Sequence, residues 1–330
     1  MINKKYLFTR TDRIGDFLVS AILIKSIKRS DKNSIITVIA SDKNYNYIKK
    51  FSYVDEVIKY PTNLLDKFSF FINFFLKKYF MVAALDGKKR SIFLCIITNS
   101  KNKILCTYKK FYKYFLKFFF SKIYLDEESI SRIDEIKNIL NNLNYNLNDS
   151  DLDIISQKNV NNSLVNNEDY ILLHFDEKWI HNDYIKNYKS IEPDNYLDFE
   201  NFIKNIVTQS ENNLYITTGL ISNKFTSLIK KKFNKINEFK FELNYNNKKI
   251  IFFEKTTFTE LEILVSKSSI LISCHGAATH VAAAFNIKII DILDKSKLLF
   301  YEKWTRHLRN YKKVERDNFR SLCNKIVNIL

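Results

Sequence analysis

Short runs of apolar residues alternate with longer amphipathic stretches along the whole chain. In the first half these runs predict buried parallel strands at 6–9, 35–40, 54–60 and 81–85. In the second half they predict strands at 170–174, 214–218, 250–253, 270–273 and 287–293. Between most of them apolar residues recur at helical spacing, as in the helix that we predict from Ile14 to Ile27. This alternation is typical of a doubly wound α/β architecture.

The periodicity fades between about 141 and 168, where Asn and Asp dominate. We place the domain boundary there, with residues 1–160 as the first α/β domain and 161–315 as the second. The 330 residues are long enough for two such domains. Within the boundary, Asp149, Asp151 and Asp153 superficially resemble a DxD metal motif. No strand precedes them, so we interpret them as a solvated linker.

Charge and cysteine usage narrow the class of protein. The chain carries 53 basic and 36 acidic side chains, a net charge of +17, which favours an anionic partner. Its four cysteines lie far apart and form no CxxC pair, which predicts reduced thiols and neither disulfides nor a zinc site: Cys95, Cys106, Cys274 and Cys323. We see no signal peptide and no apolar run of about 18 residues. We therefore expect a cytoplasmic protein, either soluble or bound to a membrane surface.

The basic residues are concentrated in one part of the chain. Residues 67–124 hold 13 basic side chains and a single acid, Asp86, and they also contain blocks rich in phenylalanine. Lysines interleaved with aromatic rings suit an anionic membrane interface, with rings at headgroup depth and ammonium groups on phosphates. Alternatively, many of the rings belong to the core and the lysines are simply solvated. The sequence leaves both interpretations open.

Chemistry is first suggested by the turn after the first strand, Arg10 to Asp16. Open α/β sheets bind ligands at the ends of their strands, and a glycine in this turn, Gly15, permits close approach of the backbone. A carboxylate at Asp16 can take a proton from a hydroxyl nucleophile. The alternative is an acid that merely stabilises the helix start, where Asp12 is the better candidate for the N-cap.

A second candidate site follows the strand at 270–273. The sequence Cys274-His275-Gly276-Ala277 leads from this strand into a helix, and its small residues allow backbone amides to face a phosphate group. His275 and His280 can donate hydrogen bonds to the same oxygens. Because they are five residues apart they do not share a helical face, and we expect no metal site.

Two further elements follow neighbouring strands in the same way. Lys178 can reach a phosphate, whereas Trp179 is expected to pack in the core. Thr217, Thr218 and Gly219 offer hydroxyls and free amides at the end of the next strand. The chain lacks the GxxxxGK[ST], GxGxxG, GxSxG and HExxH motifs, which argues against P-loop NTPases, typical dinucleotide oxidoreductases, serine hydrolases and zincins.

Taken in order, these motifs resemble glycosyltransferase family 9, the heptosyltransferases of lipopolysaccharide core assembly. The resemblance rests on four stretches: Arg13-Ile-Gly-Asp16, Asp86-Gly-Lys-Lys-Arg-Ser91, Glu177-Lys-Trp179 and the residues from Cys274 to Ala283. It spans nearly the whole chain, although Cys274-His275 stands where the family has Asp-Thr. It implies the GT-B fold, with two facing Rossmann-like domains, the active site in the cleft, and a final helix, 316–330, that packs back on the first domain.

The resemblance also implies roles for residues. Asp16 would be the general base for the acceptor hydroxyl. Basic residues of the first domain would meet a phosphorylated acceptor: Arg13, Lys88, Lys89 and Arg90. The donor diphosphate would be held from the second domain by Lys178, Thr217, Thr218, Gly219, His275, Gly276, Ala277 and His280.

The implied activity is inverting, metal-independent transfer of a heptose or related sugar from a nucleotide-diphosphate sugar, without a cofactor. The acceptor would be a lipopolysaccharide core or another anionic lipid-linked glycan at the cytoplasmic face of the inner membrane. Two alternatives stay open. The chain is a degenerate family member that binds without turnover, or it is a basic nucleic-acid-binding protein, although it carries no helix-turn-helix, RRM or zinc-finger signature.

Overall fold

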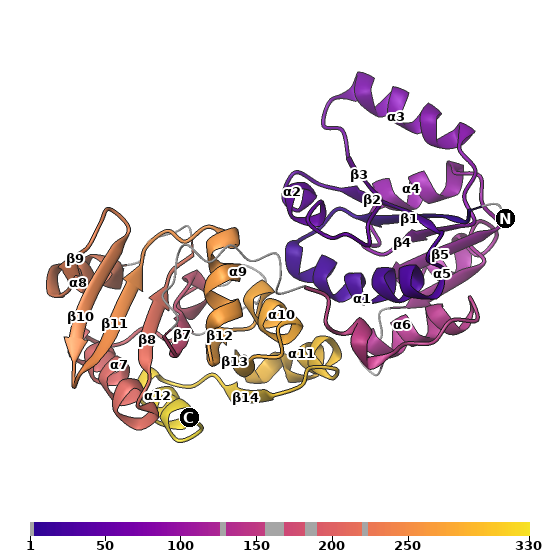
Figure 1. Ribbon diagram of the computed structural model, residues 1–330. Helices are drawn as coiled ribbons and strands as arrows, with labels where there is room; N and C mark the ends of the chain where they lie inside the picture. Colours follow the sequence, from indigo (N-terminus) through magenta and orange to yellow (C-terminus); the bar gives the residue numbers. More distant parts are fainter. Residues whose placement is uncertain (1–2, 126–129, 156–167, 182–189, 220–223) are drawn as a thin grey trace. The chain divides into compact units, whose positions relative to one another are not determined.

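The computed structural model describes residues 3–125, 130–155, 168–181, 190–219 and 224–330. The chain forms two compact units, Met1–Ile154 with Glu302–Arg306 as unit 1 and Ile155–Tyr301 with His307–Leu330 as unit 2. The division falls inside the Asn-rich region. Each unit is built on a mainly parallel sheet with helices packed on both faces (Figure 1).

The sheet of unit 1 has six parallel strands in the order β3-β2-β1-β4-β5-β6. They are β1 (Lys5–Arg10), β2 (Ile35–Ala40), β3 (Glu56–Lys59), β4 (Met81–Ala84), β5 (Asn102–Thr107) and β6 (Lys122–Leu125). The first four confirm the runs read from the sequence. We did not predict β5 and β6, because lysines interrupt their apolar residues.

The helices of unit 1 are α1 (Ile14–Ser30), α2 (Tyr45–Ile48), α3 (Leu64–Leu76), α4 (Lys89–Ile97), α5 (Tyr112–Phe115) and α6 (Arg132–Asn141), with a short 3-10 turn η1 (Asp149–Asp151). α1 packs against α6, and α3 packs against α4. α3 connects β3 to β4, and α4 connects β4 to β5. Because such connections between parallel strands are right-handed, both helices lie on the face of the sheet opposite α1 and α6 (Figure 1).

The sheet of unit 2 has the order β14-β13-β12-β7-β8-β11-β10-β9. Its strands are β7 (Tyr170–His174), β8 (Asn213–Thr217), β9 (Asn234–Lys235), β10 (Lys240–Tyr245), β11 (Lys248–Phe253), β12 (Ile270–Cys274), β13 (Lys288–Leu293) and β14 (Tyr311–Glu315). β9 and β10 run antiparallel at one edge, and the other six are parallel. The five strands predicted for this half are all present.

The helices of unit 2 are η3 (Glu177–Trp179), α7 (Tyr196–Ser210), α8 (Lys224–Lys232), α9 (Phe258–Lys267), α10 (Ala277–Ala284), η4 (Lys295–Lys297), α11 (Leu298–Thr305) and α12 (Phe319–Val327). Of these helices, α11 belongs only in part to unit 2, because its residues from Glu302 onward belong to unit 1. α7, α8 and α12 contribute to one hydrophobic core. α9 and α10 pack together.

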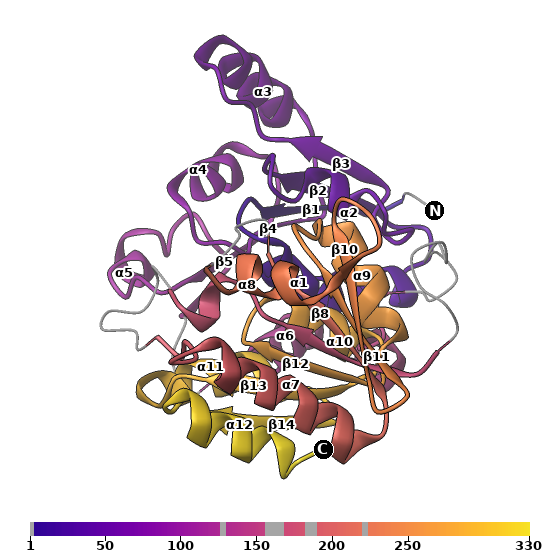
Figure 2. The ribbon, with the colours of Figure 1, turned by 90° about the vertical axis from the view of Figure 1, so that its left-hand side faces the viewer.

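The last helix has a different position from the one we expected. We predicted that 316–330 would pack back on the first domain, but Phe319 and Leu322 of α12 are buried in the core of unit 2. The ring of Phe319 meets that of Phe202 edge-on, with 5.7 Å between centroids, and Figure 2 shows α12 beside α7. The apolar face of α12 needs cover, and α7 of the same unit supplies it.

The Asp-rich triplet at the end of unit 1 is not a solvated linker, and that prediction was wrong. The side chain of Asp151 is fully buried, and the Nε and Nη2 atoms of Arg29 donate to its two oxygens at 2.9 and 3.0 Å. The backbone amide of Asn148 donates to it as well, at 2.9 Å. Lys25 binds the carbonyls of Ser150 and Asp153, both at 2.6 Å. The triplet therefore braces this end of the chain against α1.

Three further features concern metal sites, thiols and membrane spans. Within the described residues, no group of three or more His, Cys, Asp or Glu side chains is arranged to hold a metal ion. The four cysteines are free thiols, and burial raises the pKa of each. No helix in the described part of the chain combines the length and apolar character that spanning a bilayer requires.

Replacement of Asp151 by Asn should lower the free energy of unfolding by about 2 kcal/mol, because it leaves Arg29 without its carboxylate. Burial alone would raise the pKa of Asp151, but the hydrogen bonds from Arg29 and Asn148 outweigh it and hold the pKa below its usual value. The stabilisation is therefore present above about pH 4 and is lost as the pH falls through the lowered pKa.

Urea unfolding at neutral and acidic pH measures this effect. The matched control is Asp153→Asn, which changes an exposed carboxylate of the same triplet. Equal free energies of unfolding for the two variants at neutral pH would show that the ion pair between Arg29 and Asp151 does not stabilise the fold.

Candidate active site

The first candidate site lies where the loops after β1 and β4 leave the sheet of unit 1. From β1 the chain winds outward through β2 to β3, and from β4 it winds the other way through β5 to β6. β1 and β4 are paired neighbours, with Thr9 opposite Ala84, so the winding direction reverses between them. Open α/β sheets bind ligands beyond the carboxyl ends of strands at such a reversal. Both motifs from the first half of the sequence begin in these loops and continue into the first turns of α1 and α4.

Asp86, just after β4, ties the two loops together. It accepts hydrogen bonds from the amide and hydroxyl of Thr11 at 3.0 and 2.7 Å, and from the hydroxyl of Ser91 at 2.9 Å. Gly87 follows in a left-handed conformation, with φ of +59°, and a Cβ there would lie 2.8 Å from the carbonyl oxygen of Cys106. A side chain at Gly87 would therefore push the loop out of place.

Two of the predicted acceptor-binding cations hold this loop themselves. Lys88 donates to the carbonyl of Thr11 at 2.9 Å. Arg90 donates to the hydroxyl and the carbonyl of the same residue at 2.7 and 3.0 Å, and its guanidinium lies 5.0 Å from the ring centre of Tyr60. Lys89 is exposed and makes no hydrogen bond or ion pair within the described residues. Lys88 and Arg90 thus have a structural role that the sequence did not reveal.

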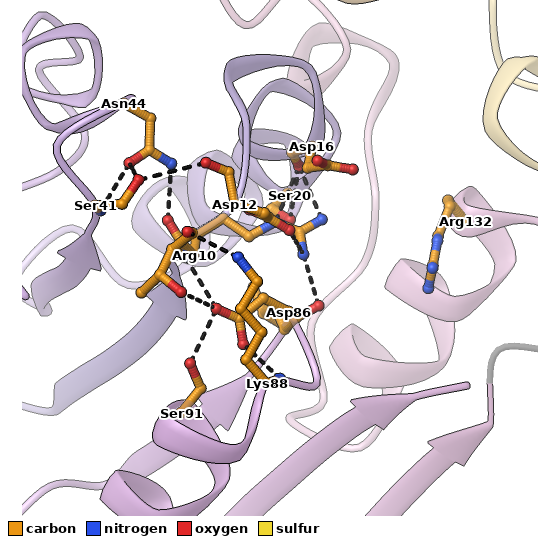
Figure 3. Close-up of polar contacts among 12 residues, drawn as sticks. Arg10, Asp12, Asp16, Ser20, Ser41, Asn44, Asp86, Lys88, Ser91 and Arg132 are labelled. Carbon is orange, nitrogen blue, oxygen red and sulfur yellow. Dashed lines mark hydrogen bonds and ion pairs between the residues drawn. The ribbon is translucent and has the colours of Figure 1, made fainter. Parts of the chain in front are cut away.

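Arg10, which we did not single out from the sequence, is the buried centre of the site (Figure 3). Its Nε and Nη2 atoms donate to the carbonyl of Asp16 at 3.1 and 3.0 Å, and Nη1 donates to the carbonyl of Leu85 at 2.6 Å. Nη1 also forms an ion pair with Asp12 at 3.0 Å. One guanidinium therefore fixes the first turn of α1, the loop after β4 and the loop after β1. The sequence signal that could have identified Arg10 is a charged residue at the end of an apolar strand.

Asp16 keeps its carboxylate available. Its backbone carbonyl is held by Arg10, but its half-exposed side chain makes no hydrogen bond or ion pair within the described residues. Asp16 lies in the first turn of α1. Arg13 is the exposed N-cap residue of this helix, and its side chain makes no capping hydrogen bond. The site therefore presents a carboxylate on a rigid helix start.

Asp12 differs from Asp16 in its environment. Burial raises the pKa of Asp12 to about 6, an effect that Arg10 opposes and the charges of Asp16 and Asp86 reinforce. One of its oxygens pairs with Arg10, and the other is buried without a hydrogen-bond partner. Asp12 does not cap α1, contrary to our expectation, because that position is held by Arg13.

A small cavity of about 30 Å³ lies beside Arg10, between α1 and α6. Its lining includes Ser20, Cys106, Arg132 and Glu135. A volume of this size admits about one water molecule. It cannot hold a sugar or a nucleotide.

The second candidate site lies at the corresponding place in unit 2. The chain winds from β7 through β8 in one direction and from β12 through β13 in the other, and β7 and β12 are paired neighbours. The three second-half motifs follow β7, β8 and β12, which are adjacent strands. The structure thus brings together on one sheet edge the segments that the sequence predicted to share it.

Lys178 lies over the start of α10. A Cβ built on Gly276, the N-cap residue of this helix, would be 2.1 Å from the Lys178 ammonium, so a side chain there would shift the ammonium from this position. Burial alone would lower the pKa of Lys178, but Asp176, with an oxygen 3.5 Å away, contributes most to raising it above its usual value. The ammonium is therefore charged at neutral pH. A cation beside the unsatisfied amides of a helix start, including that of Ala277, forms an anion-binding arrangement.

Asp291 of β13, absent from our sequence-based candidates, anchors this motif. Its buried carboxylate accepts hydrogen bonds from Thr279 at 3.0 Å and Tyr311 at 3.0 Å, and it contacts the Nδ1 atom of His275 at 2.7 Å. Thr279 also accepts from the amide of Gly276 at 3.2 Å. These bonds orient the imidazole of His275 with its Nδ1 edge toward the carboxylate.

His280 is buried within the same motif and cannot supply positive charge at neutral pH. Burial, together with the nearby His275, His307 and Lys178, lowers its pKa well below the usual value. The rings of His275 and His280 meet edge-on, with 5.4 Å between centroids. A neutral imidazole donates from one nitrogen at most, so His280 can only assist in binding an oxygen.

The hydroxyls after β8 are already engaged within the unit. Thr217 is buried and bonds the Nδ1 atom of His174 at 2.9 Å, whereas the Thr218 hydroxyl accepts from the amide of Lys255 at 3.2 Å. Gly219 lies beside Glu177, whose Oε2 atom is 2.6 Å from an ideal Cβ position. These residues shape the edge of the site. If the two hydroxyls contact the donor as predicted, they must do so in addition to the hydrogen bonds that they already make within the unit.

Arg316 is a further residue that sequence inspection missed. Its Nη1 and Nη2 atoms donate to the carbonyls of Lys178 and Trp179 at 2.8 and 3.1 Å. Nη1 also lies 3.4 Å from the sulfur of Cys274. Arg316 therefore holds the turn that carries Lys178 against the end of β12. Arg316 directly follows the last residue of β14 and lies outside the sequence motifs, so no motif pointed to it.

No family model matches the sequence, and no curated protein matches it. Solved structures do match. The E. coli heptosyltransferase WaaC with ADP-2-deoxy-2-fluoro heptose has a TM-score of 0.68 at 11% identity, and the match covers 98% of each chain.

Two further structures share the architecture. A glycosyl transferase of family 9 from Veillonella parvula has a TM-score of 0.66 at 14% identity, covering 95% of this chain and 86% of that one. The UDP-GlcNAc 2-epimerase of Methanocaldococcus jannaschii has a TM-score of 0.54 at 10% identity, covering 99% and 92%. At such low identity these likenesses show the fold. The chain has the two-domain, Rossmann-like GT-B fold that the sequence predicted.

Proposed function

We propose that the protein is an inverting glycosyltransferase that moves a sugar from a nucleotide-diphosphate donor to a glycan hydroxyl. The observation that carries the proposal is that each sheet has a different chemical group at its reversal point. Unit 1 presents the carboxylate of Asp16, and unit 2 presents the ammonium of Lys178 at the start of α10. A base and an anion site are the two groups that glycosyl transfer from a diphosphate requires.

In the proposed reaction the acceptor hydroxyl gives its proton to Asp16 as its oxygen bonds to the anomeric carbon of the donor sugar. The bond from that carbon to the diphosphate oxygen breaks, and the nucleoside diphosphate leaves with the electron pair. Because one oxygen replaces another in a single displacement, the configuration inverts. Lys178 and the helix amides stabilise the charge that develops on the leaving group. We propose that these groups take the place of a metal ion.

The donor class is supported by the structural neighbours, since WaaC was determined with ADP and with an ADP-heptose analogue. We propose a heptose or a related sugar as the transferred group. For the acceptor we propose an anionic lipid-linked glycan, such as a lipopolysaccharide core, at the cytoplasmic face of the inner membrane. We assign the exposed cations Arg13 and Lys89 to its phosphates, whereas Lys88 and Arg90 are engaged with Thr11.

Asp16 is a better candidate for the base than Asp12. A base must reach the substrate, and the Asp16 side chain is half-exposed on a helix turn, whereas Asp12 is paired with Arg10. We assign Asp12 to the electrostatic support of the site.

Replacement of Asp16 by Asn should reduce turnover by about 10²-fold or more, because a positioned base contributes that much to the rate. Affinity for the nucleoside diphosphate should stay within about twofold, since Asp16 does not touch the donor phosphates in this scheme. A thermal-shift panel of ADP-, UDP-, GDP- and CMP-sugars first names the donor. Release of the nucleotide in the presence of lipid-linked glycan acceptors then measures turnover.

Asp153→Asn is the control for a removed carboxylate in the same unit. Unchanged turnover in the Asp16 variant would refute the base role, and so would a loss of nucleotide affinity with turnover preserved at saturation. Binding of the donor by wild type without any turnover would favour a degenerate enzyme.

Replacement of Lys178 by Met should weaken binding of the nucleoside diphosphate by about 10- to 100-fold, the value of a charge-assisted hydrogen bond. Gly276→Ala should weaken it as well, because the new Cβ displaces the ammonium. Affinity for the unphosphorylated nucleoside should change little in either variant. Calorimetry in the presence of EDTA measures both ligands, with Lys267→Met, an exposed lysine of the same unit, as control. Equal losses for nucleoside and diphosphate would contradict a phosphate contact.

The raised pKa of Asp12 predicts that its ionisation lowers the free energy of unfolding. Its pKa is about 6 in the folded protein, above the usual value of about 4, so the fold favours the neutral form. Its contribution is favourable below about pH 4 and is lost as the pH rises through 6. Asp12→Asn should therefore raise the free energy of unfolding by about 1–2 kcal/mol at pH 8 and by almost nothing at pH 4. Chemical unfolding across this range tests the sign, and a destabilised variant at pH 8 would contradict it.

A further inference from the structure

Helix α3 of unit 1 has an outer face that is entirely apolar and exposed. Six of its side chains are between 45% and 86% exposed: Leu64, Leu65, Phe68, Ile72, Phe75 and Leu76. At 100° per residue these six positions fall within an arc of about 120°, and no polar residue of α3 falls inside that arc. We call this set the outer face of α3.

The fold of unit 1 does not use the outer face. α3 is attached through its inner side, where Phe74 is buried in the core and Phe70 and Phe71 pack against it. The rings of Phe70 and Phe74 are 4.8 Å apart, and that of Phe71 lies 4.9 Å from Phe93 of α4. A surface helix normally pairs one apolar face with a polar one. An apolar face left in water beside another already buried indicates a second partner.

A second exposed apolar segment lies on the same face of the sheet. Residues 108–119 include six rings that are at least half exposed: Tyr108, Phe111, Tyr114, Phe115, Phe118 and Phe119. Tyr112 and Leu116 of this segment pack on the same core cluster as Phe70 and Phe71 of α3. The aromatic segment and α3 therefore pack on the same core cluster of unit 1, and Figure 1 shows α3 on the side of the sheet opposite α1 and α6.

Apart from Asp66 in the first turn of α3, the charges around these apolar groups are positive. Lys77 and Lys78 follow the end of α3, and Lys110, Lys113 and Lys117 alternate with the exposed rings. Asp86, the single acid between 67 and 124, is engaged with Thr11 and Ser91 at the sheet edge. Two copies of this surface would repel each other, whereas an anionic bilayer satisfies both the rings and the ammonium groups.

We propose that the outer face of α3 and the segment 108–119 together bind the surface of an anionic lipid bilayer. Its 13 residues make α3 about 20 Å long, shorter than the roughly 30 Å of hydrocarbon in a bilayer, so the helix lies in the interface and does not cross. The leucines and phenylalanines enter the headgroup boundary, and the lysines contact lipid phosphates. The inference deepens the proposed function by naming its membrane surface, but its test measures lipid binding alone, so each can fail separately.

Sedimentation of the full chain with lipid vesicles tests the proposal. Wild type should bind vesicles of roughly three parts phosphatidylcholine to one part phosphatidylglycerol more tightly than pure phosphatidylcholine, and added salt should weaken the binding. The triple variant Leu65→Gln, Phe68→Gln and Phe75→Gln should bind at least about tenfold more weakly. Glutamine keeps helix propensity, and the three positions are exposed, so the fold should persist.

The matched control replaces three exposed apolar residues of unit 2, Leu197→Gln, Ile236→Gln and Leu299→Gln, and should bind vesicles as wild type does. Circular dichroism and nucleotide binding verify folding of both triple variants. A tryptophan at position 68, Phe68→Trp, should shift its emission to the blue on anionic vesicles and be quenched by brominated lipid.

Three results would overturn the proposal. They are no sedimentation of wild type with anionic vesicles, sedimentation that the α3 triple variant leaves unchanged, and self-association in solution that the same variant abolishes. The last result would assign the outer face of α3 to a second copy of the chain or to another protein.

Discussion

The candidate site of unit 1 depends on the buried guanidinium of Arg10. Its five donors lie in one plane, and the fold uses them on carbonyls of α1 and of the loop after β4. Asp12 pairs with this cation at 3.0 Å, but burial pushes the carboxyl group of Asp12 toward its neutral form. The backbone of Asp16 is thereby held while its carboxylate stays available to solvent.

Unit 2 follows the same physical logic with the signs reversed. The buried carboxylate of Asp291 gathers Thr279, Tyr311 and His275 and so orders the start of α10. The ammonium of Lys178 is then held beside that start, over a glycine that leaves it room. In both units a buried ionic group satisfies the surrounding polar atoms and leaves a functional group of opposite charge at the sheet edge. Under the proposed function, base chemistry and anion binding are separated in this way on two similar scaffolds.

The large positive charge of the chain does not serve a single purpose. Lys88 and Arg90 hold a loop, Arg29 braces Asp151, and Lys178 belongs to the anion site. The lysines near α3 and in 108–119 stand instead among exposed apolar side chains. Net charge alone therefore indicates an anionic partner without locating it. The position of that partner is inferred by setting aside the cations that already have hydrogen-bond or ion-pair partners inside the fold.

Much of the architecture was determined by the sequence itself. Strands buried on both faces must be apolar throughout, so β1, β2, β7 and β12 were visible as continuous runs. Short strands with lysines, such as β6 and β14, lie at sheet edges, where one side meets water and the apolar signal weakens. The loops with Asp16 and Gly276 were visible because small or charged residues follow an apolar run directly.

Only the tertiary structure decided which polar residues support those that were visible. Asp86 meets Thr11 across 75 residues, Arg29 meets Asp151 across 122, and Arg316 meets Lys178 across 138. Local pattern cannot distinguish a solvated aspartate from one paired at such a distance, which is why the triplet at Asp151 was misread. The free energy of a buried charge depends on partners that only folding brings within hydrogen-bond reach.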